Sequence, residues 1–330
     1  MSKTNKNNVF FVCSHSAEAD GGIYTFELAE NGKPKQLSFI RADRPSYAII
    51  SDGMLYATLR EPLPMQSGIV KYKINDDFSL TQIGDTEPTH GGVAAHLCVH
   101  RGKVYCANYL GGTTICLPDK MAVHNGKGIN PIRQLSSHPH QVLPTPDGNF
   151  MVINDLGTDT VRIFDLQLQN EVFTAKTPDG SGARHGIFSN DGKYYYCVGE
   201  MGSNVSVFEY ENGKMKYINT TSVLPGSFNG QSTASAIRMF KDKIYISNRG
   251  HDSVCVLSAS GSDISVEGFI FSVGESPREF NFVNDFLVCG NENTDDITVF
   301  RMRSDGFADY CGNETKITIK KPWGITPLIG

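Results

Sequence analysis

The stretch from His140 to Leu166, HQVLPTPDGNFMVINDLGTDTVRIFDL, decides the fold. It contains three short apolar runs, separated by a turn at Asp147-Gly148 and by a second polar turn at Asp159. Asp and Gly suit such turns, because an Asp side chain caps backbone groups and Gly readily adopts positive φ. The pattern predicts three consecutive antiparallel strands.

The same unit recurs along the chain with a period of about 46 residues. One column of equivalent positions, at the start of a strand, reads Ser46, Ala95, His140, Arg184, Ser235, Arg278 and Trp323. A second column, at the end of the next strand, reads Ser14, Leu59, Tyr109, Asp155, Glu200, Arg249 and Asn291. A period in the forties built from short strands is typical of propeller blades. The seven copies predict an all-β fold, a seven-bladed β-propeller.

The two ends of the chain predict how the ring closes. The N-terminal run NVFFVCS matches the second strand of a blade that lacks its first strand, and Pro322-Trp323-Gly324-Ile325 resembles the first-strand starts. We therefore expect the N- and C-terminal strands to pair in one blade, which leaves no free sheet edge there. Because the repeat runs from end to end, residues 1–330 are expected to form a single domain.

Composition excludes several classes of partner. The net charge is −5, and no cluster of Lys and Arg provides the basic patch that nucleic acid requires. No apolar segment approaches the length of a membrane span or of a signal-peptide core, so we expect a cytoplasmic protein without a membrane partner. Most of the eight cysteines, Cys13, Cys106, Cys197, Cys255 and Cys289 among them, fall inside predicted strands, which favours reduced thiols.

The two columns predict a charged site. The first strand of an antiparallel pair leaves one end of the sheet and the second returns to it, so both columns should lie on the same rim of the ring. His140, Arg184, Arg278 and Trp323 would then face Asp155, Glu200, Arg249 and Asn291. Each of these side chains could instead satisfy backbone groups between blades. Together the arginines favour a small anionic substrate, because a guanidinium binds carboxylate or phosphate through two donors.

No metal or other cofactor is expected. His138 and His140 are two residues apart, as two ligands on one strand would be, but Pro139 lies between them and no third ligand is evident. For this pair, structural roles are therefore favoured over metal binding.

Several segments carry a resemblance to a known family: HPHQVLPTPDG (138–148), NDLGTDTVRIF (154–164), ARHGIFSNDGKYYYCVGE (183–200), ISNRGHDSV (246–254) and SPREF (276–280). They resemble the lactonase family of seven-bladed propellers, which includes propeller-type 6-phosphogluconolactonases and carboxymuconate-lactonizing enzymes. The resemblance implies that His140, Arg184, Glu200 and Arg249 form the active site. The chain departs from the family at Ala236, where relatives resemble a segment with glutamate.

The function that this resemblance implies is hydrolysis of a sugar lactone, 6-phosphogluconolactone, to 6-phosphogluconate. His140 is the candidate general base, since its reference pKa near 6.5 allows it to accept a proton at neutral pH, and Glu200 would orient it or share that role. Arg184 and Arg249 would hold the oxyanion and anionic groups. Arg278 is a candidate for phosphate binding, and the further substrate-binding candidates are Asp155, His185 and Asn291. Two alternatives stay open: a carboxy-cis,cis-muconate cycloisomerase, and a non-catalytic interaction propeller.

Overall fold

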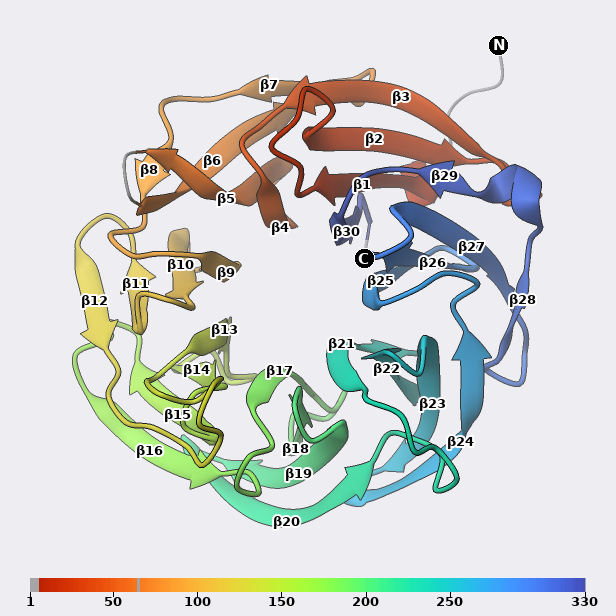
Figure 1. Cartoon of the computed structure of the whole chain (residues 1–330). Coiled ribbons are helices and arrows are strands. Elements are labelled where there is room, and N and C mark those ends of the chain that lie inside the picture. The colour runs from red at the N-terminus through yellow and green to blue at the C-terminus, as the bar shows by residue number, and fades with distance from the viewer. Residues whose placement is uncertain (1–5, 64–65, 330) are drawn as a thin grey trace.

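Residues 6–63 and 66–329 are described by the computed structural model, and they form seven antiparallel sheets arranged in a ring (Figure 1). In each sheet the strands follow one another outward from the axis of the ring. The predicted seven-bladed β-propeller is therefore confirmed. The described helices are two short 3-10 turns, η1 (Lys6–Asn8) and η2 (Asn313–Thr315). None of the described helices is long and apolar enough to cross a bilayer.

Four blades begin in the first half of the chain. The blade at the N-terminus contains β1 (Val9–Ser14), β2 (Gly22–Leu28) and β3 (Pro34–Arg41). The second blade contains β4 (Pro45–Ser51), β5 (Met54–Leu63), β6 (Gln66–Ile74), β7 (Leu80–Gln82) and the short additional strand β8 (Glu87–Pro88). The third contains β9 (Ala94–His100), β10 (Lys103–Asn108), β11 (Thr113–Cys116) and β12 (Lys120–Val123). The fourth contains β13 (Pro139–Pro144), β14 (Phe150–Asp155), β15 (Thr160–Asp165) and β16 (Glu171–Lys176).

The other three blades follow the same order. The fifth contains β17 (Ala183–Phe188), β18 (Tyr194–Gly199), β19 (Asn204–Glu211) and β20 (Lys214–Ser222). The sixth contains β21 (Thr233–Phe240), β22 (Lys243–Arg249), β23 (Ser253–Ser260) and β24 (Asp263–Phe271). The seventh contains β25 (Pro277–Val283), β26 (Phe286–Asn291), β27 (Asp296–Met302), β28 (Ala308–Tyr310) and the short β29 (Ile317–Thr318), which pairs with β27.

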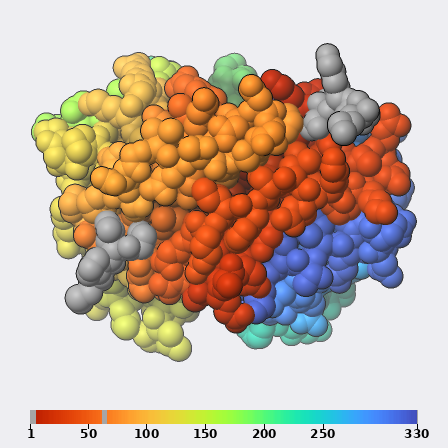
Figure 2. All heavy atoms as spheres, turned by 90° about the horizontal axis from the view of Figure 1, so that it is seen from above, coloured from red at the N-terminus to blue at the C-terminus, as the bar shows by residue number. Residues whose placement is uncertain are grey.

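The ring closes through the chain ends. The C-terminal strand β30 (Pro322–Pro327) pairs antiparallel with β1, so that Phe11 lies opposite Thr326 and Cys13 opposite Gly324. This sheet therefore has the order β3-β2-β1-β30. Figure 2 shows the red N-terminal residues directly against the blue C-terminal ones. The predicted closure by pairing of the terminal strands is confirmed.

The apolar core is divided among the contacts between blades. The described buried residues form seven hydrophobic clusters, and each cluster joins strands of two neighbouring blades. In the middle strands both faces are covered, so strands such as β1 and β26 are buried along their whole length. All eight cysteines are free thiols, and seven of them are buried, as expected for small apolar side chains in strands. This division leaves the axis of the ring to polar side chains.

Candidate active site

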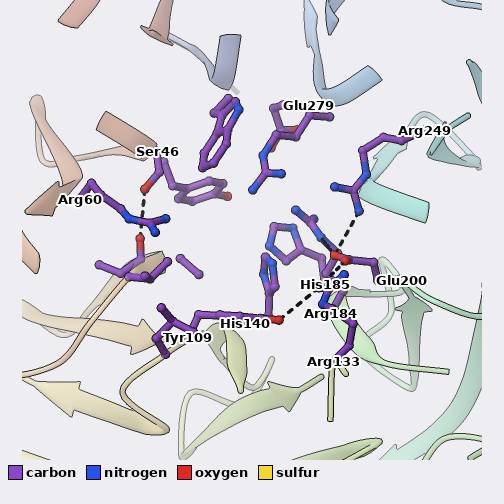
Figure 3. Close-up of a pocket in the computed structure, with 17 residues that line it drawn as sticks. Ser46, Arg60, Tyr109, Arg133, His140, Arg184, His185, Glu200, Arg249 and Glu279 are labelled. Atoms are coloured by element: carbon purple, nitrogen blue, oxygen red, sulfur yellow. Dashed lines mark hydrogen bonds and ion pairs between the residues drawn. The ribbon is translucent and has the colours of Figure 1, made fainter. Parts of the chain in front are cut away.

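A cavity of about 370 Å³ lies where the seven blades meet (Figure 3). Every blade contributes to its lining, from Trp323 in the first blade through His140 in the fourth to Arg278 in the seventh. A volume of this size suits one small molecule. The cavity therefore receives chemical groups from segments that are far apart in the sequence.

Bulges at the starts of the innermost strands place the first-column residues. In all seven blades the pairing of the first two strands shifts register at these positions: Ser46, Ala95, His140, Arg184, Ser235, Arg278 and Trp323. A bulge leaves a residue outside the regular ladder and re-aims its side chain. Six of these seven residues line the cavity, Ser235 being the exception.

Glu200 binds three arginines. Its Oε2 accepts a hydrogen bond from Arg184 Nε at 2.8 Å and lies 3.1 Å from Arg249 Nη2. Its Oε1 accepts a hydrogen bond from Arg133 Nη2 at 2.8 Å. Arg184 also donates to the carbonyl oxygen of Ser235 at 2.9 Å. Both carboxylate oxygens are therefore occupied by guanidinium donors.

These contacts control the charge of the cluster. Burial favours a protonated Glu200, but Arg249 and Arg184, with Arg133, hold the pKa of that carboxyl well below 4.5. Burial lowers the pKa of Arg184 to about 9, against the opposing effect of Glu200. Glu200 is consequently a carboxylate at neutral pH, and Arg184 a guanidinium cation.

His140 is neutral at neutral pH. Burial, followed by the positive charge of Arg184, holds its pKa well below 6.5. Its ring packs against the rings of Tyr109 and His185, with centroids 5.5 and 5.0 Å away. Its Nδ1 atom is buried without a hydrogen-bond partner among the described residues. An uncharged imidazole can accept a proton from water or from a substrate hydroxyl.

A second set of side chains follows the bulged residues in the sequence. Tyr47 packs on His96 with ring centroids 4.3 Å apart, and His96 lies 5.4 Å from His185. Both ring nitrogens of His185 are buried and lack hydrogen-bond partners within the described part of the chain. Glu279 pairs with Arg238 at 2.7 Å, and burial raises the pKa of this carboxyl above 4.5. His185 and Glu279 line the cavity.

Another side of the cavity is formed by Arg278 and its neighbours. The guanidinium of Arg278 lies 3.7 Å from the centre of the Trp323 ring, and Trp323 stacks on His15 with centroids 3.6 Å apart. Arg278 Nη1 lies 3.4 Å from a carboxylate oxygen of Glu292. Arg60 lines the same cavity from β5. These contacts hold cationic groups at the cavity wall.

The lining is strongly positive. It contains five arginines (Arg60, Arg133, Arg184, Arg249 and Arg278) and two glutamates (Glu200 and Glu279), a formal excess of three positive charges in a chain whose net charge is −5. Such a local excess attracts anions and raises their concentration at the site. An anionic small molecule is the ligand class that fits this lining.

Most of the site residues predicted from the sequence line the cavity, and two do not. His140, Arg184, Glu200 and Arg249 line one cavity, together with Arg278 and His185, and their chemical roles stay predictions.

Asp155 and Asn291 lie elsewhere. Asp155 accepts hydrogen bonds from Ser137 Oγ and from the backbone N–H of His138. Asn291 donates to Asp296 and Thr298. Neither side chain lines the cavity, so we assign both to the ends of their strands and not to the site.

Asp155 and Asn291 do not line the cavity because the second column, as aligned from the sequence, is displaced by one residue in their blades. Pairing places Asp155 opposite Pro139 and Asn291 opposite Pro277, whereas the equivalent residue in the fifth blade is Gly199, not Glu200. Neighbouring residues of a strand point to opposite faces, so a slip of one residue exchanges inward for outward side chains. The position that faces the cavity is the next one, and it contains Arg60, Tyr109, Glu200 and Arg249.

Sequence reasoning missed Arg60, Arg133 and Glu279. Arg60 follows Leu59 of the misaligned column, so the correct register would have found it. Arg133 comes from the connection between β12 and β13, where no repeat position exists. Ala236, where the family resemblance predicts glutamate, is fully buried in the contact between the sixth and seventh blades, and its N–H donates to Ser247 Oγ.

No group of three or more His, Cys, Asp and Glu side chains in residues 6–63 and 66–329 is arranged to hold a metal ion. His138 Nδ1 lies 2.9 Å from the carbonyl oxygen of Tyr109, and its ring stacks on Tyr109. His138 therefore has a structural role.

Sequence comparison gives one family. The model described as lactonase, 7-bladed beta-propeller, matches residues 9–308. The chain is also 28% identical to an uncharacterised protein of Staphylococcus aureus strain N315, across 92% of this chain and 95% of that protein.

Solved structures show the same architecture. A candidate 6-phosphogluconolactonase from Bacteroides fragilis superposes with a TM-score of 0.88 and 25% identity, covering 98% of this chain and 99% of that one. The periplasmic gluconolactonase of Pseudomonas aeruginosa superposes with a TM-score of 0.87 and 23% identity, covering 96% and 98% of the two chains. The second likeness concerns the fold alone.

Proposed function

We propose, because the chain belongs to the lactonase family of seven-bladed β-propellers, that it hydrolyses a small anionic lactone, with 6-phosphogluconolactone as the substrate. The observation that carries the proposal is the cavity at the axis, where His140 and Glu200 lie among five arginines. The Bacteroides fragilis neighbour is described as a candidate 6-phosphogluconolactonase, which supports a phosphorylated sugar lactone as the substrate. A cytoplasmic location stays a prediction.

His140 is the proposed general base. It takes a proton from a water molecule, whose oxygen forms a bond to the lactone carbonyl carbon. The carbonyl oxygen becomes an oxyanion, which Arg184 and Arg249 stabilise. When the intermediate collapses, the bond between the carbonyl carbon and the ring oxygen breaks. The ring oxygen recovers the proton from His140, and the product is a hydroxy acid.

Glu200 is the proposed positioning residue. A base must offer a free lone pair to the water that it activates, and three guanidinium contacts leave Glu200 one such lone pair, on Oε1. Its pKa lies well below 4.5, which makes it a weak proton acceptor. Holding Arg184, Arg249 and Arg133 in fixed orientations is the role that its contacts support.

The test is an assay of the purified protein with 6-phosphogluconolactone and with unphosphorylated gluconolactone, corrected for spontaneous ring opening. The phosphorylated lactone should be hydrolysed faster than the spontaneous rate and in preference to the other. If neither lactone opens faster with the protein than without it, the proposed activity is wrong.

The arginines also support a second candidate, cycloisomerisation of a carboxylated muconate to a lactone. Several guanidinium groups around a small cavity suit a substrate with more than one carboxylate. The two reactions are separated by incubating the same protein with carboxymuconate and measuring the ultraviolet absorbance of this substrate over time. Only a cycloisomerase consumes it.

A further inference from the structure

Two of the cavity arginines are poorly neutralised. In Figure 3, Arg60 lies on the opposite side of the cavity from Glu200. Within the described part of the chain, the guanidinium of Arg60 forms a loose ion pair with Glu61: its Nε lies 4.0 Å from a carboxylate oxygen of this half-exposed side chain. Arg278 is 3.4 Å from Glu292, a longer distance than the 2.8 Å contacts at Glu200. Both pairs are therefore looser than those at Glu200, and Glu61 also binds Arg44 at 3.1 Å.

The positive charges of these arginines act on His15. Burial, and then the positive charges of Arg278, Arg60 and Arg44, lower the pKa of His15 to about 3. Arg278 belongs to the seventh blade and Arg60 to the second, and the first blade, which contributes the stacked His15 and Trp323, lies between these two blades. Burial also lowers the pKa of Arg278. The two arginines line one cavity with their side chains 28% and 20% exposed, and an anion bound between them would reduce the repulsion of their charges.

The aromatic stack gives Arg278 a fixed orientation. Its guanidinium lies 3.7 Å from the centre of the Trp323 ring, and the ring of His15 stacks on the same Trp323 ring with centroids 3.6 Å apart. A guanidinium on an aromatic face keeps its charge and leaves its edge donors free for other partners. Arg278 is thus prepared to bind an anion before the ligand arrives, which reduces the entropy lost on binding.

We infer that Arg60 and Arg278 form a subsite for a second anionic group, a phosphate or a carboxylate carried by the substrate at a distance from its lactone carbonyl. The inference rests on the proposed function for the identity of that substrate. His140 and the arginines that bind Glu200 would hold the reacting carbonyl, with Arg60 across the cavity from Glu200. Arg60 then determines specificity without contacting the reacting atoms, and lactones that lack a distal charge are poor substrates.

The experiment compares Arg60→Gln with the wild type on phosphorylated gluconolactone, unphosphorylated gluconolactone and a carboxylated lactone. Loss of a charged hydrogen-bonding partner should raise KM for the charged substrate about 10- to 100-fold and leave kcat within about 3-fold. The kinetics of the uncharged lactone should not change. Which charged lactone shows the effect identifies the anion as phosphate or carboxylate. Equal effects on charged and uncharged lactones, or none, would overturn the subsite.

Two further variants control the comparison. Arg303→Gln removes the same charge from an exposed site paired with Asp305 and Asp309, and should leave all kinetic constants unchanged. Arg60→Lys keeps the charge but loses the planar fork, so it should raise KM for the charged lactone by about 3- to 10-fold. If Arg60→Gln does not fold, Arg60→Lys decides by the presence or absence of this rise.

Failure of the proposed function is distinguished by a binding measurement with inorganic phosphate. If the wild type hydrolyses no lactone but binds phosphate in calorimetry, and Arg60→Gln or Arg60→Lys weakens this binding at least about 3-fold, the activity is wrong and the subsite stands. If the wild type turns over no lactone and binds neither phosphate nor a small carboxylate such as acetate, or if the variants bind the anion equally well, the subsite is wrong.

Discussion

His140 and Glu200 are buried in the same cavity, and their surroundings drive their protonation in different ways. His140 loses its proton because burial and Arg184 disfavour the imidazolium. Glu200 stays ionised despite burial because Arg249, Arg184 and Arg133 surround it. One group is an uncharged proton acceptor and the other a fixed anion, which supports separate roles for two neighbouring titratable side chains.

The first prediction concerns the general base. Replacing His140 with Ala should lower kcat by about 10²–10⁴-fold, because a positioned proton acceptor is lost. Steady-state kinetics on the phosphorylated lactone measure the change. His100→Ala is the control: His100 lies at the other end of a first strand, bound to the carbonyl of Gly148, and its loss should leave kcat unchanged. Full activity in folded His140→Ala would refute the mechanism.

The second prediction concerns pH. The pKa of His140 lies well below 6.5, so the neutral, proton-accepting form persists when the pH falls below that value. The acid limb of kcat/KM, which reports the free enzyme, should therefore fall well below pH 6.5 and not near it. Rates measured from pH 4 to 8 locate this limb. A half-maximal kcat/KM at or above pH 6.5 would show that a different group, or a differently solvated His140, takes the proton.

The residues of the site differ in how far they can be predicted from the sequence. His140, Arg184 and Arg278 occupy strand starts with a repeating position, so their convergence is predictable from spacing. The second column gave the wrong position at Asp155 and Asn291, whose side chains make hydrogen bonds at the strand ends. The residue at the strand end and the residue facing the cavity are adjacent in the chain and both are often polar, so residue type does not distinguish them. Arg133 lies in a connection without a repeat, and its contact with Glu200 depends on a loop conformation that no periodicity specifies.

At the scale of strands, the bulge at each blade start connects the fold to the site. The innermost strand pairs regularly along most of its length, and its register shifts only where the first-column residue lies. The apolar residues that follow fix the strand between two blades, so the bulged side chain is held on a rigid element. A site built in this way is positioned more accurately than one on free loops.

The third prediction concerns the closing strand. Ile325 of β30 is almost fully buried in the cluster between the first and seventh blades. Ile325→Ala should lower the free energy of unfolding by about 2–5 kcal/mol, because it leaves a cavity in a packed layer. Ile329→Ala is the matched control, since Ile329 is 52% exposed and follows the strand, and it should change stability by less than about 0.5 kcal/mol. Denaturant unfolding of both variants measures the difference, and similar values would contradict the closure.

The blades were predictable because each strand is marked twice, by an apolar run and by a turn. In the turn at Asp147-Gly148, Gly148 has φ 69° and donates to Thr145 O at 2.8 Å, while Thr145 Oγ1 donates to Asp147 at 2.6 Å. The additional strands β8 and β29 have two residues each and pair only at the edge of β6 or β27. Segments this short carry no periodicity from which a strand could be predicted.

At the scale of the whole molecule, the fold places its apolar groups between blades and its titratable groups at the axis. The ring contacts among His96, His140 and His185 show this concentration, and none of the three is protonated at neutral pH. The positive cavity in a negatively charged chain is a second result of it. The arrangement that creates the site therefore also makes stability depend on pH.

The fourth prediction concerns that dependence. Burial first, and neighbouring arginines second, lower the pKa values of His15 and His96 to about 3, and those of His140 and His185 well below 6.5. Burial lowers the pKa of His124 to about 4. Below pH 6.5 the unfolded chain binds protons at these histidines while the folded chain does not, so stability falls as the pH falls. Each histidine contributes about 1.4 kcal/mol per pH unit, and Glu279, with its raised pKa, offsets part of the sum.

Melting temperatures measured between pH 7.5 and 5 should therefore fall by about 10 °C, most of it below pH 6.5. His124→Gln should make the acid slope shallower by about 1.4 kcal/mol per pH unit, whatever its effect at neutral pH, because one proton fewer is taken up on unfolding. His90→Gln, at an exposed position, should leave the slope unchanged. A melting temperature that stays constant from pH 7.5 to 5 would mean that the buried histidines already bind protons in the folded protein, and an uncharged His140 would then be lost as the candidate base.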